Sequence, residues 1–223
     1  MQTKIRFFSV TFDFHGHELI SRVKAASQRA PENIVLADLD ETRVSASLYL
    51  FHPRKISIAR RDADGEVTWE SVETLDRVAV KIHMSKKNAV ISAVNSPRSS
   101  KFIDSLMSEL CLGGRYFYES MEIDENLIKK HVSKFDAARL VSAKVRDFAV
   151  YEGAVGRFEV TSKNGLMDEI APFLRGKFYR VDSLTYELTH KFSSFLITYS
   201  SSGSIKINDT HMDMILPSFE KLI

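Results

Sequence analysis

Apolar and polar residues alternate over several short stretches of the chain, and this period of two residues predicts β-strands. Residues 4–14 form the first stretch, and others follow at 33–37, 44–51, 55–61 and 66–72. The sequence Asp-Ala-Asp-Gly at 62–65 predicts a hairpin, because glycine supplies the positive φ that a tight turn needs. Two more hairpins are predicted over 78–94 and 193–207.

Four other stretches carry apolar residues three or four positions apart, which predicts amphipathic helices over 18–30, 99–112, 124–134 and 210–222. The clearest apolar stripe belongs to 99–112 and consists of Phe102, Ile103, Leu106, Met107 and Leu110. A hairpin followed by a helix occurs twice. This repetition is compatible with an internal duplication and also with two halves that reuse one motif.

These elements predict an α+β protein of two halves, each an antiparallel sheet of hairpins covered by helices on one face. We expect an N-terminal domain over 1–115 and a C-terminal domain over 116–223, because the Gly113-Gly114 pair ends a helix there. The same elements are also compatible with a single domain.

The composition is that of a folded protein, since 44% of the 223 residues are hydrophobic and 27% are charged. Lys and Arg number 31 against 29 Asp and Glu, which excludes a histone-like polycation but permits a local basic face. The single cysteine, Cys111, excludes an intramolecular disulfide, and its apolar helical surroundings predict a buried side chain. Without a signal-peptide core or a stretch of about 18 apolar residues, we expect a cytoplasmic protein with no direct membrane insertion.

Two short patterns suggest chemistry. The stretch 34–42 is an apolar strand that ends in Asp38-x-Asp40-x-Thr42, and it resembles the first motif of haloacid-dehalogenase-type phosphatases. That resemblance implies Asp38 as nucleophile, Asp40 as acid/base and a bound magnesium ion. The alternative is a polar turn after a short strand. Because the surrounding hairpins predict antiparallel strands, we expect neither catalysis nor a cofactor.

The second pattern is Asp13-x-His15-x-His17, whose side chains fall on one side of a strand and form an alternative metal site. Surface or capping histidines explain the same pattern. We therefore expect no metal site.

Basic residues are concentrated in the middle of the chain. From 77 to 103 there are six basic residues and no Asp or Glu. Several basic side chains on one surface would bind a nucleic-acid backbone in a salt-sensitive, sequence-tolerant way. The predicted DNA-binding residues are Arg54, Lys55, Arg60, Arg61, Lys86, Lys87, Arg98, Lys101, Lys129, Lys130 and Lys134. Solvated surface lysines are the alternative interpretation.

The stretches 44–67, 78–110 and 131–148 follow one another in an order and spacing that resembles the RexA family of phage exclusion proteins. The resemblance implies a cytoplasmic, homodimeric DNA-binding protein that acts in antiviral defence by abortive infection. It also implies a possible small membrane protein as partner. We therefore predict a non-enzymatic, largely sequence-independent binder of double-stranded DNA. Two alternatives remain: a magnesium-dependent phosphatase of the haloacid-dehalogenase type that uses Asp38 and Asp40, and a protein-interaction module that does not bind nucleic acid.

Overall fold

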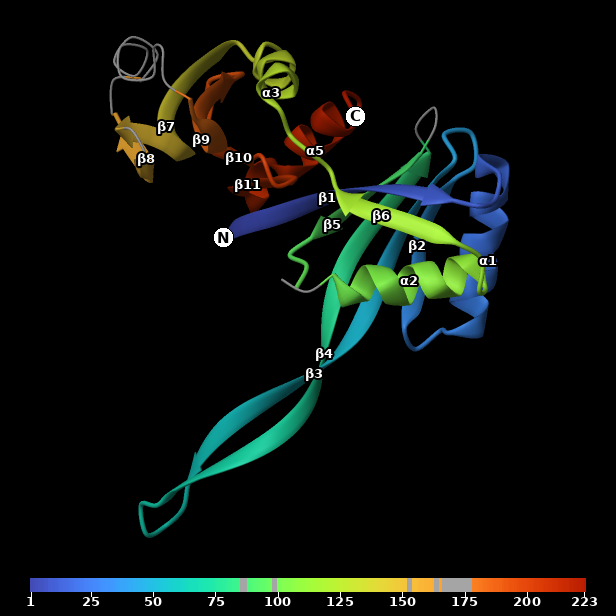
Figure 1. The fold of residues 1–223 in the computed structure, drawn as a ribbon. Coiled ribbons are helices and arrows are strands. Elements are labelled where there is room, and N and C mark those ends of the chain that lie inside the picture. The colour runs from blue at the N-terminus through green and yellow to red at the C-terminus, as the bar shows by residue number, and fades with distance from the viewer. Residues whose placement is uncertain (85–87, 98–99, 152–153, 163–164, 166–177) are drawn as a thin grey trace. The chain divides into compact units, whose positions relative to one another are not determined.

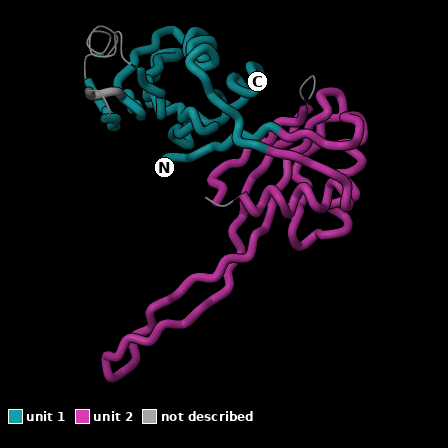
Figure 2. The backbone as a smooth tube through the Cα atoms, in the orientation of Figure 1, with its two compact units in different colours: residues 1–9, 119–223 teal, residues 10–118 magenta. Residues whose placement is uncertain are grey.

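The computed structural model describes residues 1–84, 88–97, 100–151, 154–162, 165 and 178–223 (Figure 1). These residues form eleven strands and four α-helices, so the predicted α+β class is confirmed. The chain divides into two compact units, which Figure 2 colours separately. Unit 1 comprises residues 1–9 and 119–223, and unit 2 comprises residues 10–118.

The strands belong to one antiparallel sheet, in the order β2-β3-β4-β5-β1-β11-β10-β9-β7-β8, with β6 also paired to β1. The expectation of two halves with separate sheets is therefore wrong. The single sheet results from β1 (Gln2–Phe12), which hydrogen-bonds to β5 (Ala89–Val94) and to β11 (Ser204–Asn208). A strand with a partner on both edges leaves no sheet boundary at that position.

Unit 2 is a four-strand meander with two helices. The apolar stripe of α2 is buried in full, from Phe102 to Leu110, as the period of its residues predicts. The helix ends where Leu112 adopts φ 51° and Gly113 adopts φ 84°. Besides β5, unit 2 contains α1 (Leu19–Arg29), β2 (Ile34–Asp40), β3 (Ser45–Arg61), β4 (Val67–Met84), α2 (Lys101–Cys111) and part of β6 (Tyr116–Ser120).

The β3–β4 hairpin extends beyond its neighbours in the sheet. β2 pairs with β3 only at 45–50, and β5 pairs with β4 only at 79–84. Residues 51–77, which we call the arm, form strand pairs only with one another as far as the predicted turn, apart from a hydrogen bond from the backbone N–H of Phe51 to the carbonyl of Asn33 at the base of the arm. Figure 1 shows the arm as a two-stranded ribbon that leaves the rest of unit 2.

Unit 1 repeats the order helix, strands, helix. The second predicted hairpin–helix, formed by β10, β11 and α5, is confirmed. The Asn208 side chain caps the short 3-10 turn before α5 by accepting a hydrogen bond from the backbone N–H of Thr210. The elements of unit 1 besides β1 and β11 include α3 (Glu125–Val132), β7 (Ala137–Tyr151), β8 (Ala154–Thr161), β9 (Arg180–His190), β10 (Ser193–Ser200) and α5 (Met212–Glu220).

Cys111 of unit 2 is buried, as predicted, and burial raises the pKa of its thiol.

None of the helices in the described ranges has the length and apolarity needed to cross a bilayer.

Candidate nucleic-acid interface

The basic residues predicted on the arm have carboxylate partners. Arg54 lies 3.6 Å from Asp76, Lys55 lies 3.4 Å from Glu73, and Arg60 lies 2.9 Å from Glu70. The arm as a whole carries five basic and six acidic residues. The exposed Arg61 lies next to the acidic turn at 62–66. The arm therefore presents no net positive charge to a polyanion.

The other predicted residues fall in different places. Lys101 is the exposed first residue of α2 in unit 2. Lys129, Lys130 and Lys134 belong to unit 1, where Lys129 lies 3.9 Å from Glu125 and the Lys134 ammonium donates to the carbonyl of Ser218. Lys130 is exposed on α3. Lys86, Lys87 and Arg98 lie outside the described residues.

A different basic surface is built by the register of the strands in unit 1. Residues that stand directly opposite each other on neighbouring strands share one face of a sheet. Two rows of polar residues cross six strands on this face, which we call the polar face. The first row is Lys4, Lys206, Thr198, Thr185, Ser142 and Thr161, and the second is Arg6, Ser204, Ser200, Ser183, Lys144 and Glu159.

The row between these two points the other way and forms the core of unit 1. It consists of Ile5, Ile205, Tyr199, Leu184 and Ala143, all of which are buried. Phe219 of α5 packs against Tyr199 on that side, with ring centroids 6.3 Å apart. The strands of unit 1 therefore alternate between a core face and the polar face.

Lys4 and Lys206 are direct cross-strand partners on the polar face, and both are exposed. Like charges placed opposite each other destabilise a sheet unless an anion compensates them. The face holds four cationic residues and one carboxylate, Glu159, which lies 2.9 Å from Lys144. The hydroxyls of the first row are paired, Thr185 with Thr198 and Thr161 with Ser142, and each pair keeps one hydroxyl hydrogen that can contact a phosphate oxygen.

Sequence reasoning missed this face because its cations come from different strands. Lys4 stands between Thr3 and Ile5, and Lys206 between Ile205 and Ile207. A single lysine flanked by buried residues on a strand is a signal for a polar outer face. Only the pairing of β1 with β11 places the two lysines together.

The two alternative chemical sites have local structural roles. Asp40 accepts hydrogen bonds from the backbone N–H groups of Thr42 and Arg43 and from the Thr42 hydroxyl, which lowers the pKa of its carboxyl. Asp38 is exposed on β2, which pairs antiparallel with β3. A haloacid-dehalogenase-type site requires a parallel strand at this position.

Asp13 accepts a hydrogen bond from the backbone N–H of Arg115, 2.9 Å away, whereas the rings of His15 and His17 stack with centroids 5.6 Å apart. Across the described ranges, no three His, Cys, Asp or Glu side chains are grouped so that they could hold a metal ion.

A buried histidine lies in the core of unit 1. The Nδ1 and Nε2 atoms of His131 lie 2.6 Å from the Tyr199 hydroxyl and 2.7 Å from Ser218 Oγ. Burial lowers the pKa of His131 from 6.5 to about 4 and raises the pKa of Tyr199. The side chain of His131 is fully buried, so this trio contributes to packing rather than to a surface site.

Comparison with known proteins gives no family: no protein-family model matches the chain, and no curated protein matches it.

Proposed function

We propose that the protein is a non-enzymatic binder of double-stranded DNA that contacts the phosphate backbone through the polar face of unit 1. The observation that carries this proposal is the direct pairing of Lys4 with Lys206. The row of hydroxyls beside them contains no acidic residue. Lysines and hydroxyls that approach phosphates without reading base edges favour binding that is insensitive to sequence.

The composition of the polar face favours a duplex over a single strand. Proteins that bind single strands stack the unpaired bases on aromatic side chains. Neither row of the polar face contains Phe, Tyr or Trp. The resemblance to the RexA family extends this proposal: the protein would act as a sensor or regulator in phage exclusion through its binding of duplex DNA.

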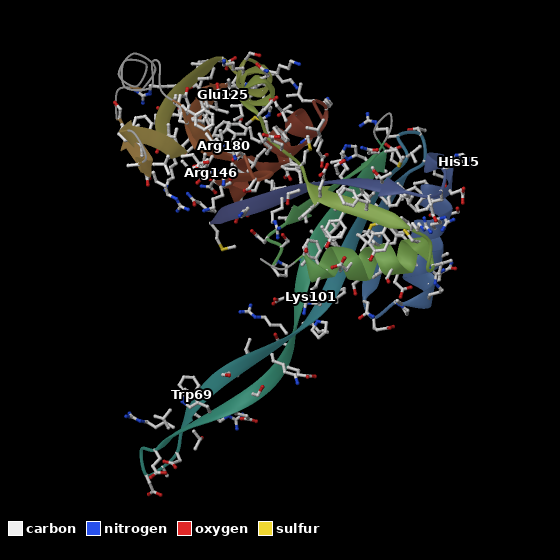
Figure 3. All side chains as sticks on the ribbon, viewed as in Figure 1. His15, Trp69, Lys101, Glu125, Arg146 and Arg180 are labelled. Atoms are coloured by element: carbon white, nitrogen blue, oxygen red, sulfur yellow. The ribbon has the colours of Figure 1, made fainter. Side chains whose placement is uncertain are left out.

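We further propose that two copies of the chain associate through the arm. Four large apolar side chains are exposed on it: Trp69 (Figure 3) at 72%, Leu75 at 63%, Val67 at 53% and Ile58 at 39%. A two-stranded ribbon with exposed apolar side chains is marginally stable in water, and a protein surface that covers it supplies the missing burial.

Charge complementarity favours a second copy as that surface. The turn of the arm carries Asp62, Asp64 and Glu66, whereas the stretch 77–103 has basic residues and no acidic ones. Both belong to unit 2, so a two-fold dimer can bring the acidic turn of each copy to the basic stretch of its partner. The two polar faces would then bind one duplex with the gain in avidity that linkage provides.

A titration of a duplex oligonucleotide at increasing salt concentration tests the DNA-binding proposal. The parent protein should bind with an affinity that falls steeply as salt rises, and the double variant Lys4→Gln/Lys206→Gln should bind at least tenfold more weakly at low salt. Equal binding by parent and variant would contradict the assignment to the polar face. Absence of any retention on DNA would favour the interaction-module alternative.

A further inference from the structure

Unit 1 contains a cleft of about 560 Å³ whose lining is distinct from the polar face. A volume of this size suits a small ligand. Its lining includes buried residues of unit 1, among them Ile123, Ile128 and Tyr199, which form the floor of the cleft. The polar groups around the floor are Ser120, Glu122, Asp124, Glu125, Arg146, Arg180, Ser201 and Ser202.

Two arginines meet at one end of the cleft. Arg146 of β7 and Arg180 of β9 are direct cross-strand partners, and both are exposed (Figure 3). Two guanidinium groups in this relation repel each other. Arg180 Nε lies 3.7 Å from Asp147 Oδ2, while the guanidinium group of Arg146 has no hydrogen bond or ion pair with any residue that the structure describes. One carboxylate therefore offsets two positive charges.

The backbone is irregular where Arg146 enters the cleft. The register of β7 shifts on both of its edges in this region, and Asp147 adopts φ 54°. Bulges of this kind redirect side chains and occur frequently beside binding sites. The positive φ costs free energy that an undistorted strand would not incur, so the arginine pair is held at a local energetic cost.

Three carboxylates line the cleft beside the beginning of α3. Asp124 Oδ1 accepts a hydrogen bond from the backbone N–H of Leu127, 2.7 Å away, and Glu125 lies 3.9 Å from Lys129. Glu122 is exposed and has no partner among the described residues. No ion pair within 4.0 Å joins these carboxylates to Arg146 or Arg180 in the described part of the chain. The cleft therefore holds positive and negative groups that do not neutralise each other.

We infer that this cleft binds a small phosphorylated molecule that also carries hydroxyl or amino groups, such as a sugar phosphate or a nucleotide. Arg146 and Arg180 bind the phosphate, because two guanidinium forks match its charge and its several acceptor oxygens. The hydroxyl of Ser120, which also lines the cleft, adds a donor to the same group, whereas the Ser201 hydroxyl already donates to the carbonyl of Asp182. Glu122 accepts hydrogen bonds from hydroxyl groups at the other end of the ligand, as carboxylates do with ribose.

Calorimetric titration with three probes tests this inference at constant ionic strength: ribose 5-phosphate, inorganic phosphate and ribose. Ribose 5-phosphate should bind at least tenfold more tightly than inorganic phosphate, and ribose alone should not bind. Equal affinities for ribose 5-phosphate and inorganic phosphate would overturn the inference that the cleft recognises both ends of a ligand. A duplex without terminal phosphates should not displace ribose 5-phosphate. Displacement would assign the arginines to the DNA backbone instead.

Variants separate the two ends of the ligand. Arg146→Gln should lower the affinity for both phosphates at least tenfold and raise the melting temperature of the free protein, because it removes the repulsion between the arginines. The matched control is Arg157→Gln, because Arg157 is an exposed residue of β8 that does not line the cleft. This variant should leave both affinities unchanged. Glu122→Gln should weaken ribose 5-phosphate alone. An Arg146→Gln protein that binds as the parent does would overturn the inference.

Discussion

The hydroxyl of Tyr199 donates its hydrogen to Nδ1 of His131 over 2.6 Å, in the core of unit 1. The direction of this bond follows from the third member of the network. Ser218 Oγ donates to the carbonyl of Ile215, so it accepts from His131 Nε2–H. Nδ1 is then the acceptor of a neutral ring, and protonation of His131 would remove the acceptor that the Tyr199 hydroxyl uses.

We expect stability to fall as the pH is lowered, in the range set by His131. Its pKa is about 4 in the folded protein against 6.5 as the reference value. Between these values the unfolded chain binds a proton that the folded chain does not, so acid favours unfolding. The free energy of unfolding should drop by about 3 kcal/mol from pH 7 to pH 4 through this residue. Urea unfolding at several pH values measures it.

The variant His131→Gln should flatten the pH dependence between pH 6.5 and 4, because the titrating group is gone. Tyr199→Phe keeps the imidazole and removes only its hydrogen-bond donor, and should cost about 1–3 kcal/mol at pH 7. A parent protein whose stability is constant from pH 6.5 to 4.5 would contradict the assignment.

Gly203 should not tolerate a side chain. It lies in the β10–β11 turn with φ 83°, and an added Cβ would collide with the backbone carbonyl oxygen of Met121. Backbone cannot move aside as a flexible side chain can. Gly203→Ala should therefore cost about 3 kcal/mol, from the unfavourable φ and the overlap together. Chemical denaturation of the purified variant measures this loss.

Gly65 provides the matched control in the arm. Its φ is 87°, but an added Cβ would meet nothing within 4 Å. Gly65→Ala should cost only the conformational part, about 1 kcal/mol. Equal losses for the two variants would show that the overlap with Met121 contributes nothing.

The salt dependence of DNA binding should distinguish the polar face from the residues that the sequence predicted. Lys206→Gln should reduce the slope of log affinity against log salt by about one, the value for one lost phosphate contact. Lys130→Gln removes the same charge from the exposed surface of α3 and should leave the slope unchanged. If Lys130→Gln reduced the slope and Lys206→Gln did not, the DNA-binding site would lie on α3 and not on the polar face.

The arm should control the association of two chains. Trp69→Ser removes its largest exposed apolar side chain, and sedimentation equilibrium should then show a weaker dimer, by about tenfold or more in dissociation constant. Val155→Ser, which also removes an exposed apolar side chain but in β8, is the control and should leave the dimer intact. A parent protein that stays monomeric at high concentration would exclude the arm as a dimer contact.

Local features of this fold could be predicted from the sequence, and long-range ones could not. The apolar stripe of α2 and the Asp-Gly turn of the arm each depend on residues close together in the chain, so their periodicity is sufficient. The candidate DNA site depends on the pairing of Lys4 with Lys206, which no local pattern specifies. For the same reason, the cations of the arm could be identified in the sequence but the carboxylates opposite them could not.

The pairing of β1 with β11 has a consequence for the biogenesis of the protein. Gln2 pairs with Asn208, so during translation β1 waits for a partner strand that is made about two hundred residues later. A growing chain on the ribosome exposes that edge until about two hundred residues have been added. Such distant contacts slow folding. We expect nascent chains truncated before β11 to be captured by chaperones or degraded.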